Sequence, residues 1–301
     1  MIIKTIRSVY FPLVLFLLIA ACASKTTTGP GSADLVVCGD DKVLLLNSRQ
    51  SETTPAINWR WQVSEAQDLP AAYRKWMVPL DECKPAMNRS KLLLTSSGGG
   101  VLLLDIKTKK SLFYAHVPMA HSAEILPGNR VVVALSTHPK GNSIELYDLD
   151  KPEQRLFRDS LYSGHGVVWN SKYKRLFALG FDELRAYSLK DWEGPAPQLR
   201  LEQSWKIPSE GGHDLTAVDD ETMVVTTHHN VYTFKIATMD FEVFAPLKGR
   251  ENIKSANYNR QKQQLLFTQA EESWWTHHIY MHNPDRTITI PDIKLYKVRF
   301  F

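Results

Sequence analysis

The stretch that decides the fold is His121-Ser-Ala-Glu-Ile-Leu-Pro-Gly-Asn-Arg-Val-Val-Val-Ala-Leu135. It starts with a histidine, runs through a short strand into a polar turn, and enters a second, apolar strand. The same plan restarts at His165 and His213, and, without the histidine, at Glu82 and Ser255. These starts are 39, 44, 48 and 42 residues apart. Such a period indicates a repeat architecture in which each copy is one small sheet.

Short apolar runs separated by turn residues fill the rest of the chain, and a further copy begins at Leu35. The sequence therefore predicts an all-β fold, a six-bladed β-propeller with about four antiparallel strands per blade. Residues 287–301 are expected to lock the first and last blades together, because an open ring leaves unpaired strand edges. A two-sheet sandwich is the alternative, but it does not explain the regular restart at histidine. Only residues 65–75 have the composition of a short helix, and they include Pro70.

Composition excludes several classes of protein. Of the 301 residues, 44% are hydrophobic and 23% are charged, a composition typical of a globular rather than a disordered protein. A net charge of +4 is too small to indicate a nucleic-acid-binding protein. Three cysteines are too few for a fold of this size to be held together by disulfide bonds. Cys38 and Cys83 are expected on inner strands of neighbouring blades, either as buried thiols or as a disulfide pair. No Gly-x-Ser-x-Gly, P-loop, His-Glu-x-x-His or Cys-x-x-Cys motif is present.

The N-terminal residues have the pattern of a signal peptide. Lys4 and Arg7 precede an apolar run that ends in small residues before Cys22. The tetrad Ile-Ala-Ala-Cys22 resembles the lipobox of bacterial lipoproteins, in which the cysteine is acylated, although an ordinary secretory signal would look similar. We expect a signal peptide at 1–21, a lipidated cysteine and flexible tether at 22–33, and one propeller domain at 34–301. Because no acidic cluster follows Cys22, the periplasmic face of the outer membrane is favoured over surface export.

Several motifs together resemble an uncharacterised family of six-bladed propeller lipoproteins from Bacteroidetes. They are the lipobox, Ser96-Ser-Gly-Gly-Gly100, His121-Ser-Ala-Glu-Ile-Leu-Pro127, Gly164-His-Gly166, Gly211-Gly-His-Asp-Leu215, Ser273-Trp-Trp-Thr-His277 and Leu295-Tyr-Lys-Val-Arg299. The resemblance covers nearly all of the expected mature chain. It implies a cell-envelope protein whose relatives often sit among polysaccharide-degradation genes, and it implies no reaction or catalytic residue.

The repeat places three histidines, His121, His165 and His213, at one position in consecutive blades. Inner strands of a propeller start beside the central axis, so these imidazoles are expected to form part of a ring. Three convergent histidines can hold a divalent metal ion such as zinc, or they can simply connect loops by hydrogen bonds. Glu82 falls in the same register one blade earlier, and Lys254 or Ser255 one blade later. Glu82 and Lys254 are therefore candidate catalytic residues, as base and charge stabiliser.

Loops that follow the second strand of each blade are expected to open on the same face. They carry Ser97 and the segment 269–278, in which Trp274 and Trp275 are adjacent. An aromatic face beside amides and carboxylates suits a sugar, although tryptophans also serve as core residues. Alternating strand geometry allows at most one of the two tryptophans to be exposed. The candidate ligand-binding residues are Trp274, Trp275, Gln269, Glu271, His277 and Ser97.

The resulting hypothesis is a monomeric, lipid-anchored propeller whose axial face binds or helps to process a carbohydrate. Two alternatives remain open: a metal-dependent polysaccharide lyase or hydrolase, by analogy of fold alone, and an envelope scaffold that binds proteins through its rim. The sequence leaves open whether the protein catalyses a reaction.

Overall fold

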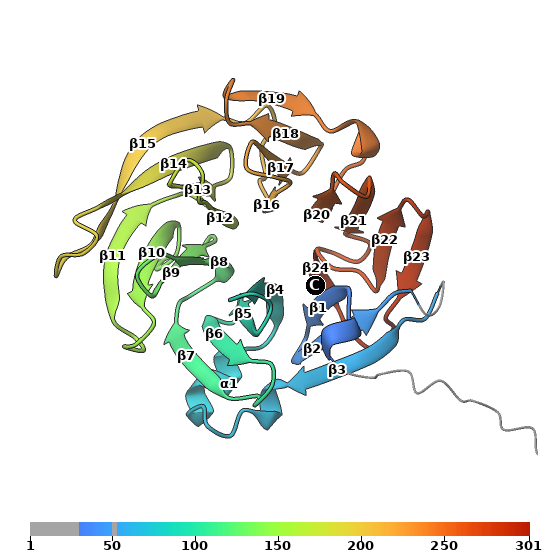
Figure 1. Ribbon diagram of the computed structural model, residues 1–301, viewed down its shortest axis with the longest axis horizontal. Helices are drawn as coiled ribbons and strands as arrows, with labels where there is room; N and C mark the ends of the chain where they lie inside the picture. The colour runs from blue at the N-terminus through green and yellow to red at the C-terminus, as the bar shows by residue number, and fades with distance from the viewer. Residues whose placement is uncertain (1–29, 50–52) are drawn as a thin grey trace, which may run out of the picture.

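A computed structural model describes residues 30–49 and 53–301 and shows six four-stranded sheets arranged in a ring (Figure 1). Every strand pair is antiparallel, so the all-β, six-bladed propeller predicted from the sequence is confirmed. The strands of blades 1 to 3 are β1 (Leu35–Gly39), β2 (Lys42–Asn47), β3 (Ala56–Gln62), β4 (Leu80–Ala86), β5 (Lys91–Ser96), β6 (Gly100–Asp105), β7 (Ser111–His116), β8 (Ala120–Leu126), β9 (Arg130–Leu135), β10 (Ser143–Asp148) and β11 (Arg155–Ser160).

Blades 4 to 6 follow in chain order, and the C-terminal strand returns to blade 1. These strands are β12 (Gly166–Asn170), β13 (Arg175–Leu179), β14 (Glu183–Lys190), β15 (Gln198–Lys206), β16 (Asp214–Ala217), β17 (Thr222–Thr226), β18 (Val231–Lys235), β19 (Asp240–Val243), β20 (Ile253–Asn259), β21 (Gln264–Gln269), β22 (His278–His282), β23 (Arg286–Thr289) and β24 (Leu295–Phe300). Blades 2 to 6 each use four consecutive strands, whereas blade 1 has the order β24-β1-β2-β3.

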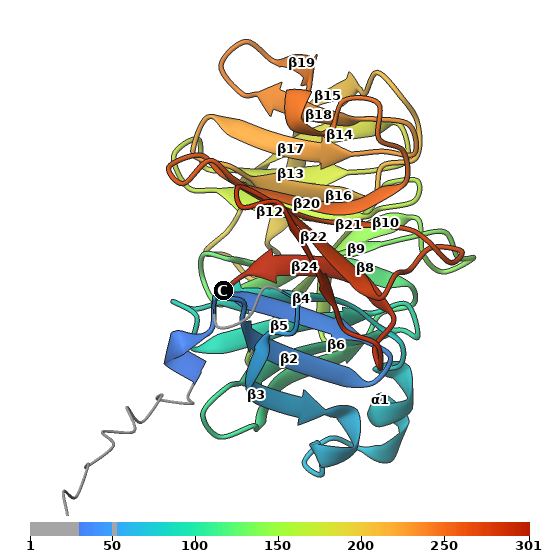
Figure 2. The same ribbon diagram turned by 90° about the vertical axis from the view of Figure 1, so that its right-hand side faces the viewer.

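The ring is closed by pairing of the C-terminal strand with the first strand of the chain. Strand β24 pairs with β1 from Leu35 opposite Phe300 to Gly39 opposite Leu295, and both lie near the axis (Figure 1). Figure 2 shows the same neighbourhood from the side, with β24 beside β4. The expected role of the C-terminal segment as the lock is therefore confirmed.

Burial explains why these short runs form strands. The second strands of the blades, such as β9 and β17, are buried on both faces because the sheets of neighbouring blades pack face to face. The outermost strands, such as β11 and β19, are largely exposed. One hydrophobic cluster between blades 1 and 2 contains Trp61, Cys38 and Cys83. Both cysteines are buried free thiols.

In the described ranges, helical structure is limited to short segments, one before β1 and three between later strands: η1 (Pro30–Ser32), η2 (Val63–Glu65), α1 (Ala71–Trp76) and η3 (Ala245–Leu247). The helix expected over residues 65–75 starts only after Pro70, whose ring suits the position before a helix but not its interior. None of the helices in the described ranges is long and apolar enough to cross a membrane. The expected signal peptide and Cys22 lie outside the described residues.

Candidate functional site

The innermost strands β24, β4, β8, β12, β16 and β20 contribute equivalent residues to three layers along the propeller axis. The first layer consists of Asp81, His121, His165, His213, Lys254 and Tyr296, which keep 4 to 9% of their surface exposed. The second layer consists of the next residues in sequence, Glu82, Ser122, Gly166, Asp214, Ser255 and Lys297, all of which are buried. The third layer, two residues further along, consists of Lys84, Glu124, Val168, Thr216, Asn257 and Arg299.

In three blades a β-bulge lies at the residue that enters the first layer. In blade 2, Leu80 pairs with Ser96 but Glu82 pairs with Thr95, so Asp81 is the extra residue. Blades 3 and 6 have the same irregularity around His121 and Lys254. The prediction that Glu82 shares the register of the histidines is wrong by one residue, because the turn between β4 and β5 (residues 87–90) is one residue longer than the turn between β8 and β9 (residues 127–129). Asp81 takes that place.

The three predicted histidines do converge. The His121 and His165 ring centroids are 4.6 Å apart, and those of His165 and His213 are 5.7 Å apart. Lys254 Nζ lies 2.7 Å from His213 Nε2, and Tyr296 Oη lies 3.5 Å from His213 Nδ1. The first layer is therefore a continuous polar ring, here called the axial ring, in which Tyr296 was not foreseen from the sequence.

The imidazoles of the axial ring are neutral at pH 7. Burial, followed by the charge of Lys254, lowers the pKa of His213 to about 2. Burial also lowers the pKa of His165 well below its ordinary value, and that of His121 despite the neighbouring Asp81 carboxylate. Burial raises the pKa of Asp81, against the effects of His121 and Ser97. The ring thus offers hydrogen-bond donors and acceptors rather than a set of fixed charges.

Four charged side chains, here called the buried ion network, close the channel beneath the axial ring: Glu82, Asp214, Lys297 and Arg299. Arg299 donates hydrogen bonds of 2.6 and 2.8 Å to Asp214 and another to Glu82. Lys297 Nζ lies 3.2 Å from Asp214 and donates to the backbone carbonyls of His121 and His165, at 3.2 and 2.9 Å. Two carboxylates and two cations balance in charge, and the network holds the backbone that carries the axial ring.

Glu82 belongs to this network rather than to the face that a ligand reaches. Burial alone would raise the pKa of Glu82, but Arg299, Lys297 and Lys84 outweigh it and lower the pKa to about 2. A carboxylate held ionised between cations and 1% exposed is a poor general base for a ligand on the axial face. Glu82 therefore has a structural role in the buried ion network. Of the two candidate catalytic residues, only Lys254 lies in the axial ring.

The arrangement of the histidines does not match a metal site. Among residues 30–49 and 53–301, no group of three or more His, Cys, Asp or Glu side chains is arranged to hold a metal ion. His213 Nε2 lies against the Lys254 amine, and His165 Nδ1 lies 2.8 Å from the carbonyl of Ser163. The Lys254 amine takes up His213 Nε2, whereas the bond of His165 Nδ1 leaves that ring's Nε2 for a ligand, 3.5 Å from Ser136 Oγ, so the described residues show no preformed site with all three predicted ligands.

The loop from Ala270 to His277 opens on the face of the axial ring, as expected, because β21 ends opposite the start of β20. Thr276 pairs with Leu295, the residue before Tyr296. Trp274 is 59% exposed, whereas Trp275 is half-buried under the Lys294 amine, 4.8 Å from its ring centroid. The expectation that at most one of the two tryptophans is exposed is confirmed, and Trp274 is that residue.

The other predicted ligand-binding residues shape this face rather than point out from it. Glu271 accepts hydrogen bonds from Thr276 and His278 within its own loop. His277 Nδ1 donates to the carbonyl of Ile293 at 2.8 Å. Gln269 bonds the backbone of Glu251 and the side chain of Arg250, and the backbone N–H of Ser97 donates to the first-layer Asp81.

Three further aromatic side chains flank the axial ring from neighbouring loops, and the sequence pattern did not single them out as a group. Tyr162 is 55% exposed and its ring centroid lies 5.5 Å from that of Phe181, which lies 6.1 Å from His228. His228 in turn lies 4.7 Å from His213. Tyr162 lies three residues before His165 in the sequence, and this short separation could have predicted that Tyr162 lies near the axial ring.

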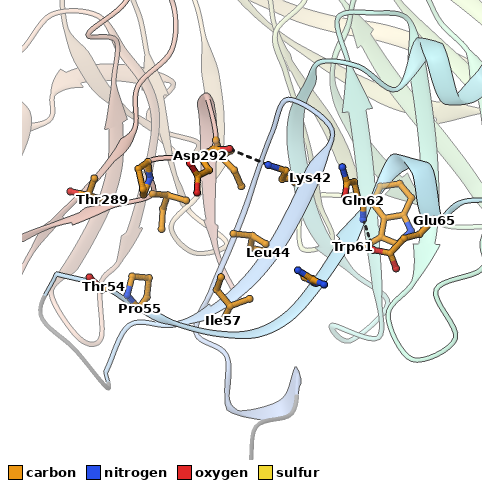
Figure 3. Close-up of a pocket in the computed structure, with 14 residues that line it drawn as sticks. Lys42, Leu44, Thr54, Pro55, Ile57, Trp61, Gln62, Glu65, Thr289 and Asp292 are labelled. Atoms are coloured by element: carbon orange, nitrogen blue, oxygen red, sulfur yellow. Dashed lines mark hydrogen bonds between the residues drawn. The ribbon is translucent and has the colours of Figure 1, made fainter.

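Two of the pockets that lie away from this face bear on function. At the opposite mouth of the channel, a cavity of about 340 Å³ includes Lys84, Glu124 and Arg299 of the third layer, with Trp169 on its wall. A second cavity, of about 360 Å³, lies on the outside of blades 1 and 6 (Figure 3). In that cavity Lys42 donates to the Asp292 carbonyl at 3.3 Å.

These features define a six-bladed β-propeller with a closed channel and a polar ring on one axial face. The chain belongs to a "Family of unknown function (DUF6528)", whose profile matches residues 13–301. A crystal structure of a protein of unknown function from Bacteroides caccae is similar in fold, with a TM-score of 0.59 at 14% identity, covering 89% of this chain and 98% of that one. No curated protein matches the sequence.

Proposed function

We propose that the axial face binds a carbohydrate, and that the axial ring with its aromatic surroundings is the binding site. The observation that carries this proposal is the convergence of six polar side chains, one from each blade, on a single solvent-contacting layer above a sealed channel. Neutral imidazoles, an amine, a carboxyl group and a phenol present the mixed donors and acceptors that sugar hydroxyls require.

The aromatic side chains supply the other half of sugar recognition. Trp274 and Tyr162 are both more than half exposed, on loops that open beside the axial ring. An exposed aromatic ring normally costs free energy in water, and the C–H face of a pyranose ring covers it. We therefore assign Trp274 and Tyr162 as contacts for the flat face of a sugar and the axial ring as the contact for its hydroxyl groups.

A glycan array tests this proposal, with the wild-type chain and the Trp274→Ala variant. The matched control is Trp169→Ala, which makes the same substitution at the opposite mouth of the channel. We expect a set of glycans that wild type and Trp169→Ala bind, and that Trp274→Ala binds up to about tenfold more weakly, since an aromatic contact contributes about 0.5 to 1.5 kcal/mol and 1.4 kcal/mol is a factor of ten. If Trp169→Ala loses glycan binding and Trp274→Ala keeps it, the proposal that the axial-ring face is the binding face is overturned.

The scaffold hypothesis is the second candidate, and the cavity on blades 1 and 6 favours it because the exposed Ile57 lines that cavity (Figure 3). Two results together would support the scaffold over the carbohydrate proposal. The wild-type chain would bind no glycan, and it would bind an envelope protein through a contact that Ile57→Ser abolishes.

We also propose that the propeller is attached to the cell envelope through acylated Cys22, on the periplasmic face of the outer membrane. The support is the signal-peptide pattern before Cys22 and the polar tether after it. Metabolic labelling with a radioactive fatty acid should label the wild-type chain and leave the Cys22→Ser variant unlabelled. Labelling of both chains, or of neither, would overturn this attachment.

A further inference from the structure

Lys254 is unusual among the lysines of the protein because its amine is buried without a carboxylate partner. Within the described ranges only Lys254 and Lys297 are buried lysines. Lys297 forms ion pairs with Asp214 and Glu82, whereas no described carboxylate lies within 4.0 Å of Lys254 Nζ. A buried ammonium without a counter-charge is costly, so this position favours the neutral, nucleophilic amine.

The groups that face Lys254 add to this effect. On β16, His213 Nε2 lies 2.7 Å from Nζ, and the His228 ring from the next loop lies 4.7 Å from that of His213. Tyr296 on β24 bonds the other nitrogen of His213, and the Lys297 amine lies in the layer below. None of these neighbours is an anion. Burial lowers the pKa of Lys254 to about 8, so about a tenth of the amine is unprotonated at pH 7, far more than for an exposed lysine.

The place of Lys254 in the axial ring matters as much as its ionisation. Nζ belongs to the layer that contacts solvent, 2.7 Å from the neutral imidazole of His213. A desolvated amine in a layer that a ligand can reach is the arrangement that carbonyl chemistry by lysine requires.

We propose that Lys254 forms an imine with the aldehyde or ketone group of a bound hydroxy-carbonyl compound, such as the open-chain form of a reducing sugar. This inference rests on the proposed carbohydrate site and narrows its ligand class. Nζ attacks the carbonyl carbon, and the carbonyl oxygen becomes a hydroxyl group. Both amine protons pass to the oxygen through solvent, one as the hydroxyl group forms and one as it leaves as water. One N–C double bond replaces one C–O double bond, and one water is released for each amine and carbonyl consumed.

Reductive trapping tests this step. The full chain is incubated at pH 7 with limiting glycolaldehyde and sodium cyanoborohydride, and peptide mapping by mass spectrometry gives the labelling rate of each lysine. Lys254 should label at least about tenfold faster than the exposed Lys75 and Lys248, which need a higher pH to become neutral. Its rate should level off above pH 8, while the rates of the exposed lysines continue to rise.

Two comparisons complete the test. In urea, Lys254 should label no faster than Lys75, because the burial that makes it reactive is lost. Equal labelling of Lys254 and Lys75 in the folded chain, or no labelling of Lys254, overturns the inference. Each reducing glycan is also compared with its alditol, which lacks the carbonyl group. If both forms bind and Lys254 is not trapped, the carbohydrate site is supported and the imine is ruled out. If Lys254 is trapped but no glycan binds, the reactive amine is supported and the carbohydrate site is ruled out.

Discussion

The guanidinium of Arg299 donates hydrogen bonds of 2.6 and 2.8 Å to the carboxylate of Asp214, and so joins blade 1 to blade 5 across the channel. Arg299 lies on β24 and Asp214 at the start of β16, with blade 6 between them in the ring. The contact is buried on both sides. One hydrogen-bonded ion pair therefore couples the closing strand to a blade with which it shares no strand pairing.

Replacement of Arg299 by methionine should destabilise the protein strongly. The change leaves Asp214 and Glu82 buried with one cation instead of two, and breaking a buried pair from one side costs about 3 to 5 kcal/mol. Urea unfolding would measure the loss. The control is Arg200→Met, because the Arg200 ion pair with Glu202 is exposed and should contribute less than about 1 kcal/mol. Similar losses in both variants would contradict a structural role for the buried ion network.

Stability should fall as the pH decreases from 7 to 4. The pKa values of His121, His165 and His213 are lower in the folded state than in the unfolded chain, so the unfolded chain binds more protons below pH 6.5. Each such histidine contributes a slope of up to about 1.4 kcal/mol per pH unit in this range. Unfolding midpoints in urea across this range would give the slope. It should become shallower in His213→Gln, and an unchanged slope would show that His213 is protonated in the folded protein.

Stability should rise between pH 8 and pH 10 because of Lys254. Its pKa is about 8 in the folded protein and about 10.4 in an unfolded chain, so the unfolded chain again binds more protons in this interval. The Lys254→Met variant should lose this rise and be more stable than wild type at pH 7, since it removes the buried amine. Thermal unfolding at several pH values would measure both effects. A variant less stable than wild type at pH 7 would mean that the Lys254 amine stabilises the fold.

Substitution of Gly212 by alanine should disturb the approach to the axial ring. A Cβ at this position would lie 2.3 Å from the carbonyl oxygen of Gly180 and 2.9 Å from Cγ of Leu179, and the backbone oxygen leaves little room to adjust. We expect a loss of about 1 to 3 kcal/mol, typical of overpacking, together with weaker glycan binding because His213 follows directly. Gly31→Ala is the matched control, since a Cβ there meets nothing within 4 Å. Calorimetry of both variants measures stability, and equal melting temperatures would count against this steric argument.

The sequence was sufficient to predict the ring of blades, because inner and second strands recur at a period that only a repeat fold produces. It also predicted that His121, His165 and His213 share one layer, and the ring contacts confirm this. It failed at Glu82, because the turn after β4 is one residue longer than the turn after β8, so that Asp81 takes the place in that layer. It also missed Tyr296, because the C-terminal segment was recognised as the lock but its residues were not aligned with the other inner strands. The Lys254 contact with His213 depends on the distance between two blades, which no spacing along the chain gives.

The position of β24 has a consequence for the order in which the molecule can be assembled. Lys297 and Arg299 leave the ribosome after every other strand, yet they neutralise Glu82 on β4 and Asp214 on β16, which are made much earlier. Until residues 295–300 are available, the partly made chain has an unpaired β1 edge and two carboxylates at its centre without their cations. The ring therefore cannot close blade by blade during synthesis. Blade 1 and the channel must form together, as one late event.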